Sequence, residues 1–171
     1  MSSNYIIREA TDTDYPQIPE IYRYYWDKHF ENMPEDYQKV LENLKEAFDK
    51  RQGYFNFWVC SNDKGEIYGW LSCLPTFMSP LRKGHNGELS IYIRNDKINK
   101  TIGGKLLNEV IKILEDSTLY MLWGHISPNN IPSQKLVTNA GFINTNLLFT
   151  NTPYYPEYNL WMKPLKRAIK K

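Results

Sequence analysis

Two hydrophobic periodicities alternate along the chain. Apolar residues three and four positions apart mark helical segments, and short runs rich in aromatic and β-branched residues mark strands between them. The run at 4–10 predicts a strand, and a helix is expected to begin after the Asp/Thr cluster at 11–14. The residues that share one face of this helix are Ile18, Ile21, Tyr22 and Tyr25.

A second helix is predicted to begin at Pro34, because proline is well suited to the first helical turn. Its apolar positions fall on one face and are Tyr37, Val40, Leu41, Leu44, Ala47 and Phe48.

An antiparallel hairpin is predicted next, from the runs at 54–61 and 66–77. They are joined by the turn at 62–65, which ends in Gly65, where a positive φ is needed. This hairpin places Cys60 opposite about Ile67, so that Cys73 lies several residues further along. We therefore expect two free, mostly buried thiols.

The second half of the chain alternates strands and helices. A strand at 88–93 leads through a loop at 94–100 into an amphipathic helix with Leu106 and Leu107 on its apolar face. The run at 119–126 has no polar alternation, which is typical of a strand covered on both faces.

A short helix follows, capped by Asn129 or Asn130, with Pro132 in its first turn and Gly141 just past its end. Strands near 144–150 and 157–163 complete the order β-α-α-β-β-β-α-β-α-β-β.

Composition narrows the possible partners. Lys and Arg number 21 against 19 Asp and Glu, and no block of like charge stands out before the closing segment 163–171. This balance argues against a nucleic-acid partner. The N-terminus has no signal-peptide pattern, and no apolar run approaches the length of a membrane span, so we expect a cytoplasmic protein without membrane contact. The 171 residues suit a single domain over 1–171.

The joint at 94–104 can hold a phosphate. A strand that leads into a helix directs unpaired N–H groups at one point, where the helix dipole is positive. Gly103 and Gly104 allow a ligand to approach the backbone closely. Nearby positive charge comes from Lys97, Lys100 and Lys105, which an ordinary exposed helix start would also show. The segment is no P-loop, since Leu106 stands where Ser or Thr would bind magnesium.

With these motifs the order of elements resembles the GNAT superfamily of acetyl-CoA-dependent N-acetyltransferases over nearly the entire chain. In the phosphate-binding loop Gly103 matches the family pattern, whereas Ile98 and Thr101 depart from it. The segment 126–142 closely follows the family's Pro-x-Asn-x-x-Ser/Ala-x-x-Leu motif and its Gly-Phe ending. The resemblance implies an α/β (α+β) fold, with a mixed, mostly antiparallel seven-stranded sheet flanked by about four helices.

The resemblance also implies acetyl-CoA as co-substrate, and no metal. The backbone of Ile91, Tyr92 and Ile93 would bond the pantetheine arm, with Asn130 and Ser133 beside it. The pyrophosphate cradle would be Asn99, Lys100, Thr101, Ile102, Gly103 and Gly104.

Within the superfamily, residues 7–25 and "GELSIYI" are similar to the branch of phosphinothricin and methionine sulfoximine acetyltransferases. The resemblance makes Glu88 the catalytic base, which would take a proton from the substrate ammonium. The other interpretation is a strand acid paired with Arg82 or Lys83. Val137 stands where the family often has a Tyr or His general acid, and the conceivable donors are Tyr92, His125 and Tyr158.

The acceptor is expected to be a small-molecule primary amine, of an amino acid or an amino-acid-like compound, with Tyr24 and Phe30 as substrate contacts. Candidate partners for its carboxylate are Arg23, Arg51 and Arg82. The alternatives are a polyamine, an antibiotic or a protein amine as acceptor, or a non-catalytic acyl-CoA-binding or interaction domain. Aromatic strands near the C-terminus would also allow a homodimer.

Overall fold

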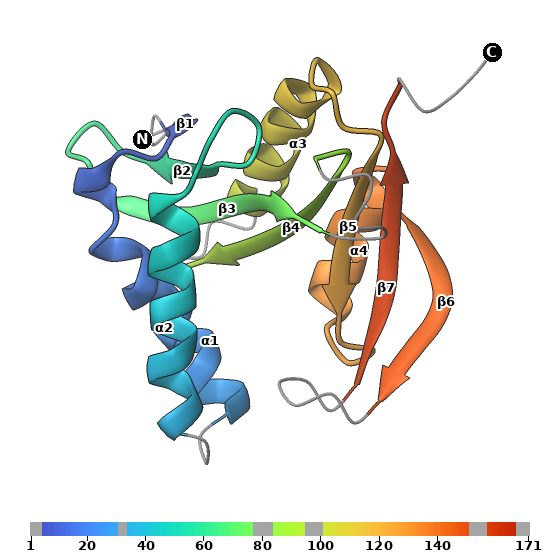
Figure 1. Ribbon diagram of the computed structural model, residues 1–171, viewed down its shortest axis with the longest axis horizontal. Coiled ribbons are helices and arrows are strands. Elements are labelled where there is room, and N and C mark those ends of the chain that lie inside the picture. Colours follow the sequence, from blue (N-terminus) through green and yellow to red (C-terminus); the bar gives the residue numbers. More distant parts are fainter. Residues whose placement is uncertain (1–4, 31–33, 77–83, 95–100, 151–156, 167–171) are drawn as a thin grey trace. The chain divides into compact units, whose positions relative to one another are not determined.

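The computed structural model describes residues 5–30, 34–76, 84–94, 101–150 and 157–166, and the predicted order of strands and helices is confirmed (Figure 1). The elements of the N-terminal half are β1 (Ile6–Glu9), the 3-10 helix η1 (Asp12–Asp14), α1 (Gln17–Phe30), α2 (Pro34–Asp49), β2 (Phe57–Ser61) and β3 (Ile67–Pro75). Those of the C-terminal half are β4 (Asn86–Ile93), α3 (Ile102–Glu115), β5 (Met121–Ile126), α4 (Ile131–Asn139), β6 (Ile143–Thr150) and β7 (Glu157–Pro164).

The strands form one seven-stranded sheet in the order β1-β2-β3-β4-β5-β7-β6. The pair β4 and β5 is parallel, whereas β1 with β2, β2 with β3, β5 with β7, and β6 with β7 are antiparallel. The predicted fold class, a mixed and mostly antiparallel sheet with four α-helices, is therefore confirmed.

The chain forms two compact units. The first comprises Met1–Cys73 with Ile91–Glu109, and the second comprises Leu74–Ser90 with Val110–Lys171. Strand β4 and helix α3 each contribute residues to both. A single domain over 1–171 stays a prediction.

The first unit is built around the hairpin of β2 and β3 and the helix pair α1 and α2, which lie side by side in Figure 1. Ile18 and Ile21, on the predicted apolar face of α1, are buried. The indole of Trp70 on β3 donates a hydrogen bond to the carbonyl of Ile18 at 3.1 Å. This bond satisfies a fully buried indole and joins α1 to the sheet.

The hairpin register differs from the expected one by two residues at Cys60. Ser61, and not Cys60, lies opposite Ile67, and a β-bulge between Cys60 and Ser61 moves the partner of Cys60 one residue further, to Gly69. Gly65 in the turn has the predicted positive φ, at 78°. Cys60 and Cys73 are free and buried as predicted, and burial raises the pKa of both thiols, that of Cys73 to about 12.

In the second unit, β7 lies between β5 and β6, and the three strands stand next to each other in Figure 1. On β5, burial of both faces is confirmed for Leu122, Trp123, Gly124 and Ile126, but His125 is exposed. An exposed imidazole on a strand whose other residues are buried, or half-buried at Met121, indicates that this face of the sheet does more than pack. None of the described helices combines the length and apolar character that a membrane crossing requires.

Candidate functional site

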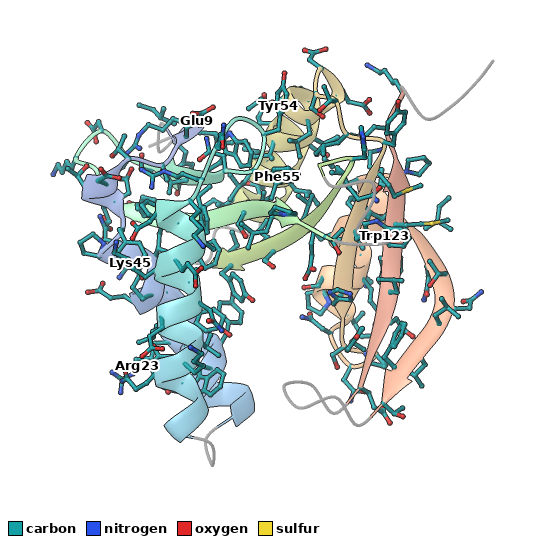
Figure 2. The ribbon with its side chains drawn as sticks, viewed as in Figure 1. Glu9, Arg23, Lys45, Tyr54, Phe55 and Trp123 are labelled. Carbon is teal, nitrogen blue, oxygen red and sulfur yellow. The ribbon has the colours of Figure 1, made fainter. Side chains whose placement is uncertain are left out.

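Glu88 lies on β4 and is held beside β5 by parallel pairing. It stands in register with Trp123, which Figure 2 labels on β5. Side chains alternate between the faces of a strand, so His125, two residues after Trp123, shares the face of Glu88. His125 Nδ1 and Glu88 Oε1 are 3.0 Å apart, a hydrogen bond. The side chains of His125 and Glu88 are 30% and 35% exposed, so both are accessible to solvent.

Aromatic side chains continue this face across the next two strands. The rings of His125 and Tyr158, on β7, meet edge to face with centroids 4.7 Å apart. Tyr158 stands opposite Phe149 of β6, and their rings stack at 5.0 Å. We call the row Glu88, His125, Tyr158 and Phe149 the Glu88 face. It places a carboxylate, an imidazole and two aromatic rings side by side on one half-exposed surface.

The start of α4 carries the other predicted site residues of the second unit. Asn130 is the N-cap of α4, and its Oδ1 accepts a hydrogen bond from the Ser133 N–H at 3.2 Å. The side chain of Gln134 donates to the carbonyls of Ser127 and Pro128, at 3.2 and 2.7 Å, and so fixes the preceding loop. Val137 is 8% exposed and supplies no titratable group to the helix.

The predicted pantetheine segment, Ile91–Ile93, lies at the end of β4 in the first unit. There the Tyr25 hydroxyl of α1 donates to the carbonyl of Ile93 at 2.8 Å and accepts from its N–H at 3.2 Å. The N–H of the next residue, Arg94, donates to the carbonyl of Tyr68 on β3. Since backbone groups of successive strand residues point to opposite edges, Tyr25 occupies the edge of Ile93 that faces away from β3.

Of the predicted pyrophosphate cradle, the structure describes Thr101 and the residues that follow it. Thr101 is exposed, and its carbonyl accepts from the Lys105 N–H at 3.0 Å, the first helical bond of α3. Ile102 is fully buried, so it can offer a ligand its backbone but not its side chain. The amides of the first turn have no partner inside the helix. Asn99 and Lys100, like Ile98, lie outside the described residues.

Of the two predicted substrate contacts, Tyr24 is 39% exposed and packs edge to face against Tyr25 with ring centroids 5.3 Å apart. Phe30 ends α1, and its side chain lies outside the described residues. Other aromatic rings of this unit pack against Tyr92 of β4, namely those of Tyr22, Tyr25 and Trp70. This cluster fastens the end of β4 to α1 and β3.

The arginines that could bind a substrate carboxylate differ in their present contacts. Arg51 donates to the Phe48 carbonyl at 2.6 Å, forms an ion pair with Asp12 and lies over the Phe48 ring. Arg23 is directed outward from α1, as Figure 2 shows, with an exposed ion pair to Asp27. Arg82 lies outside the described residues, as does Lys83.

Two contacts of the site were not predicted from the sequence. His125 was one of several conceivable proton donors, but nothing in the sequence paired it with Glu88, 37 positions away. Tyr25 was assigned to the apolar face of α1, and the signal for its second role is its hydroxyl, since a buried phenol needs a hydrogen-bond partner. The described residues include no cluster of three or more His, Cys, Asp or Glu side chains that could ligate a metal ion.

Comparison with known proteins gives a consistent set of similarities. The family described as Acetyltransferase (GNAT) domain matches residues 4–143. YwnH, a candidate phosphinothricin acetyltransferase of Bacillus subtilis (strain 168), is 31% identical over 85 residues. That match covers 50% of this chain and 52% of the relative, so the chain spans about half the length of the curated relative it matches.

Solved structures resemble nearly the whole chain. One is a phosphinothricin acetyltransferase from Sinorhizobium meliloti in complex with acetyl-CoA, with a TM-score of 0.74 and 18% identity over 94% of this chain and 88% of that one. Another is a ribosomal-protein-alanine N-acetyltransferase from Brucella melitensis, with a TM-score of 0.72 and 24% identity over 94% of this chain and 99% of that one. At these identities the likeness shows a shared fold.

Proposed function

Because this chain belongs to the GNAT acetyltransferase family, we propose that it transfers an acetyl group directly from acetyl-CoA to a primary amine of a small molecule. The acceptor we propose is an amino acid or an amino-acid-like compound. The observation that carries this proposal is the Glu88–His125 pair, a half-exposed carboxylate bonded to an imidazole on the surface of the sheet.

Amine acetylation requires a group that removes a proton. Most primary amines are ammonium ions at neutral pH and have no lone pair with which to attack a thioester. A fixed carboxylate or imidazole in contact with solvent can take that proton directly or through a water molecule. Glu88, the predicted catalytic residue, lies where both its own oxygen and the bonded imidazole meet solvent.

Acetyl-CoA supplies the activated acetyl group, and the predicted residues would hold its arm and phosphates. The first-turn amides of α3, at Ile102, Gly103 and Gly104, suit the pyrophosphate because the helix N-terminus favours negative charge. Asn130 uses its Oδ1 as a cap, which leaves its amide N–H groups for the pantetheine. Contact with the backbone of Ile93 would require displacement of the Tyr25 hydroxyl.

The Glu88 face favours a cationic acceptor. Glu88 supplies negative charge, and the rings of Tyr158 and Phe149 can attract an ammonium through cation–π contact. The names of the relatives supply two amine classes to compare: phosphinothricin, an amino-acid-like compound, and an alanine of a ribosomal protein. A homodimer and a cytoplasmic location stay predictions.

Calorimetric titration tests the coenzyme first. Acetyl-CoA and desulfo-CoA are each expected to bind with micromolar affinity, since the proposed contacts do not involve the thiol. Release of CoA is then measured with phosphinothricin, methionine sulfoximine, spermidine and a peptide that begins with alanine. Highest activity on the first two supports the proposal, and highest activity on spermidine or the peptide replaces the acceptor. If neither CoA compound binds, the interaction-domain alternative replaces the enzyme.

A further inference from the structure

The Glu88 face holds two groups that can take a proton, the Glu88 carboxylate and the His125 imidazole, and their geometry indicates a different role for each. We propose that Nε2 of His125 accepts the proton of the substrate ammonium, and that Glu88 acts as a positioning residue that holds Nδ1 of the same imidazole. This inference rests on the proposed acetyltransferase function and names the group that makes the amine reactive.

Hydrogen-bond chemistry fixes which nitrogen is available. An ionised carboxylate only accepts hydrogen bonds, so the 3.0 Å contact with Glu88 Oε1 requires a proton on Nδ1 of His125. The neutral imidazole then carries its lone pair on Nε2. Within the described part of the chain, Nε2 takes part in no hydrogen bond, and the His125 side chain is 30% exposed. A substrate ammonium can therefore reach this nitrogen.

General acid–base strength favours the imidazole over the carboxylate. Free imidazole side chains titrate near pH 6.5 and glutamate side chains near pH 4.3, whereas a lysine-type ammonium titrates near pH 10.4. The reference pKa of an imidazole is thus about two units higher than that of a glutamate carboxylate. The equilibrium for proton transfer from the ammonium is therefore about a hundredfold more favourable to an imidazole than to a carboxylate. His125 is the ionisable group that contacts Glu88 and can take the proton on these grounds. Helix α4 offers no alternative at Val137, whose side chain is not ionisable.

The groups that contact the imidazole are compatible with this role. Among the described residues, the titratable side chains against His125 are Glu88 from β4 and Tyr158 from β7. Tyr158 meets the ring edge to face, which limits its rotation, and Glu88 fixes the tautomer. Both contacts keep one orientation of the imidazole, as a proton acceptor requires.

The proposed reaction balances without any further reagent. The ammonium R–NH₃⁺ gives one proton to His125 Nε2 and becomes R–NH₂. Its nitrogen forms a C–N bond to the acetyl carbon while the C–S bond breaks and CoA leaves as a thiolate. The second nitrogen-bound proton goes to the thiolate sulfur, the third stays on the amide, and imidazolium returns its proton to solvent.

Two substitutions separate a proton acceptor from a structural partner, one at His125 and one at a second histidine. His125→Asn retains an amide N–H near the position of Nδ1 and so can still bond Glu88, but it has no basic nitrogen. We expect it to bind acetyl-CoA as the wild type does and to lose about a hundredfold to ten-thousandfold in kcat/KM. The wild type should show a rise of rate between pH 5 and 8, where imidazoles change charge, and His125→Asn should lack it.

The matched control is His85→Asn in the same unit, because His85 also packs against a tyrosine, Tyr120, with ring centroids 5.4 Å apart. It should keep the wild-type rate within twofold. If His125→Asn keeps the rate, or loses rate with an unchanged pH profile, the proposal is overturned, and Glu88 takes the proton itself.

A measurement independent of turnover separates this inference from the proposed function. Nitrogen NMR of imidazole-labelled protein should show His125 protonated at Nδ1, its signal being the one that His125→Asn removes. Glu88→Gln should yield a mixture of tautomers, because an amide can donate as well as accept. If this signal behaves as expected and no amine is acetylated, the proposed function fails while the pair stands. A wild-type His125 protonated at Nε2 overturns the pair.

Discussion

Asp14 in the first unit and Glu88 in the second each bond a basic side chain, Arg8 and His125 respectively. The Asp14 side chain is 5% exposed and accepts four hydrogen bonds, two from Arg8 and two from Thr11. The Glu88 side chain is 35% exposed, and within the described residues it takes part in one hydrogen bond, with His125. The hydrogen-bond acceptor sites of Asp14 are thus filled by the protein, whereas Glu88 keeps lone pairs that a ligand or water can use.

The difference separates a carboxylate that stabilises the fold from one that belongs to the candidate site. Burial raises the pKa of Asp14, but the hydrogen bonds from Arg8 and Thr11 lower it more, to about 2. Such a group stays ionised over the whole physiological range and has no free acceptor site for a substrate proton. The pair on the Glu88 face is half exposed and incompletely bonded, which suits catalysis better than stability.

Glu88→Gln should cause a large loss of activity with little loss of stability. We expect kcat/KM to fall by about a hundredfold to ten-thousandfold, because His125 loses the carboxylate that keeps its proton on Nδ1 and its lone pair on Nε2. The free energy of unfolding should change by less than about 1 kcal/mol, because exposed ion pairs contribute little. Steady-state kinetics and urea unfolding measure the two. A variant that acetylates every accepted amine at the wild-type rate would remove Glu88 from the site.

Asp14→Asn should show the opposite pattern, with activity kept and stability lost. The depressed pKa contributes about 2 kcal/mol above the unfolded value near 3.9, and this is lost as pH falls toward 2. Wild-type stability should therefore drop by about 2 kcal/mol between pH 5 and pH 2 beyond any drop in the variant. Urea unfolding at pH 7, 5, 3 and 2 measures it.

The matched control for Asp14 is Asp12→Asn in the same 3-10 helix. The Asp12 side chain is 90% exposed, so its loss should cost less than about 1 kcal/mol at pH 7. Equal losses in the two variants would contradict the distinction between a saturated and an open carboxylate.

How far the sequence predicts this molecule depends on how local each signal is. The helical spacing that follows Pro34 and the caps at Asn130 and Gly141 are local, and the structure has these elements where they were predicted. The hairpin register was predicted two residues off at Cys60, because neither the pairing of Ser61 with Ile67 next to the turn nor the β-bulge beside Cys60 leaves a mark in the sequence.

The site was predicted less completely, since it depends on contacts between distant segments. The family resemblance selects Glu88, but the contact with His125 arises from the parallel register of β4 and β5, which no turn between them specifies. The uninterrupted apolar run at 119–126 predicted a strand covered on both faces and so concealed the exposure of Tyr120 and His125. Likewise, Tyr25 meets Ile93 across 68 positions of sequence.

Tyr25→Phe should test the predicted pantetheine segment Ile91–Ile93, where a side chain already bonds the backbone of Ile93. Loss of the hydroxyl leaves the N–H and carbonyl of half-buried Ile93 without this partner and should cost about 1 kcal/mol of stability. If pantetheine binds the same groups, acetyl-CoA should bind about fivefold more tightly, because no hydroxyl competes. Calorimetry and urea unfolding measure both. Tyr24→Phe is the control, with neither change expected, and tenfold weaker binding in Tyr25→Phe would make Tyr25 itself a coenzyme ligand.

Asn130→Asp should have the smallest effect on folding and is informative for that reason. The Asn130 side chain has one group that is bonded within the protein and one that is left for a ligand. Its Oδ1 accepts from the Ser133 N–H, and its amide N–H groups are the predicted pantetheine donors. Aspartate caps a helix as well as asparagine does, so stability should change by less than about 0.5 kcal/mol, against a loss of about 1 kcal/mol for Asn130→Ala. Aspartate cannot donate, however. Weaker acetyl-CoA binding in Asn130→Asp, with folding unchanged, therefore assigns the amide to the coenzyme, whereas wild-type binding leaves Asn130 as a helix cap.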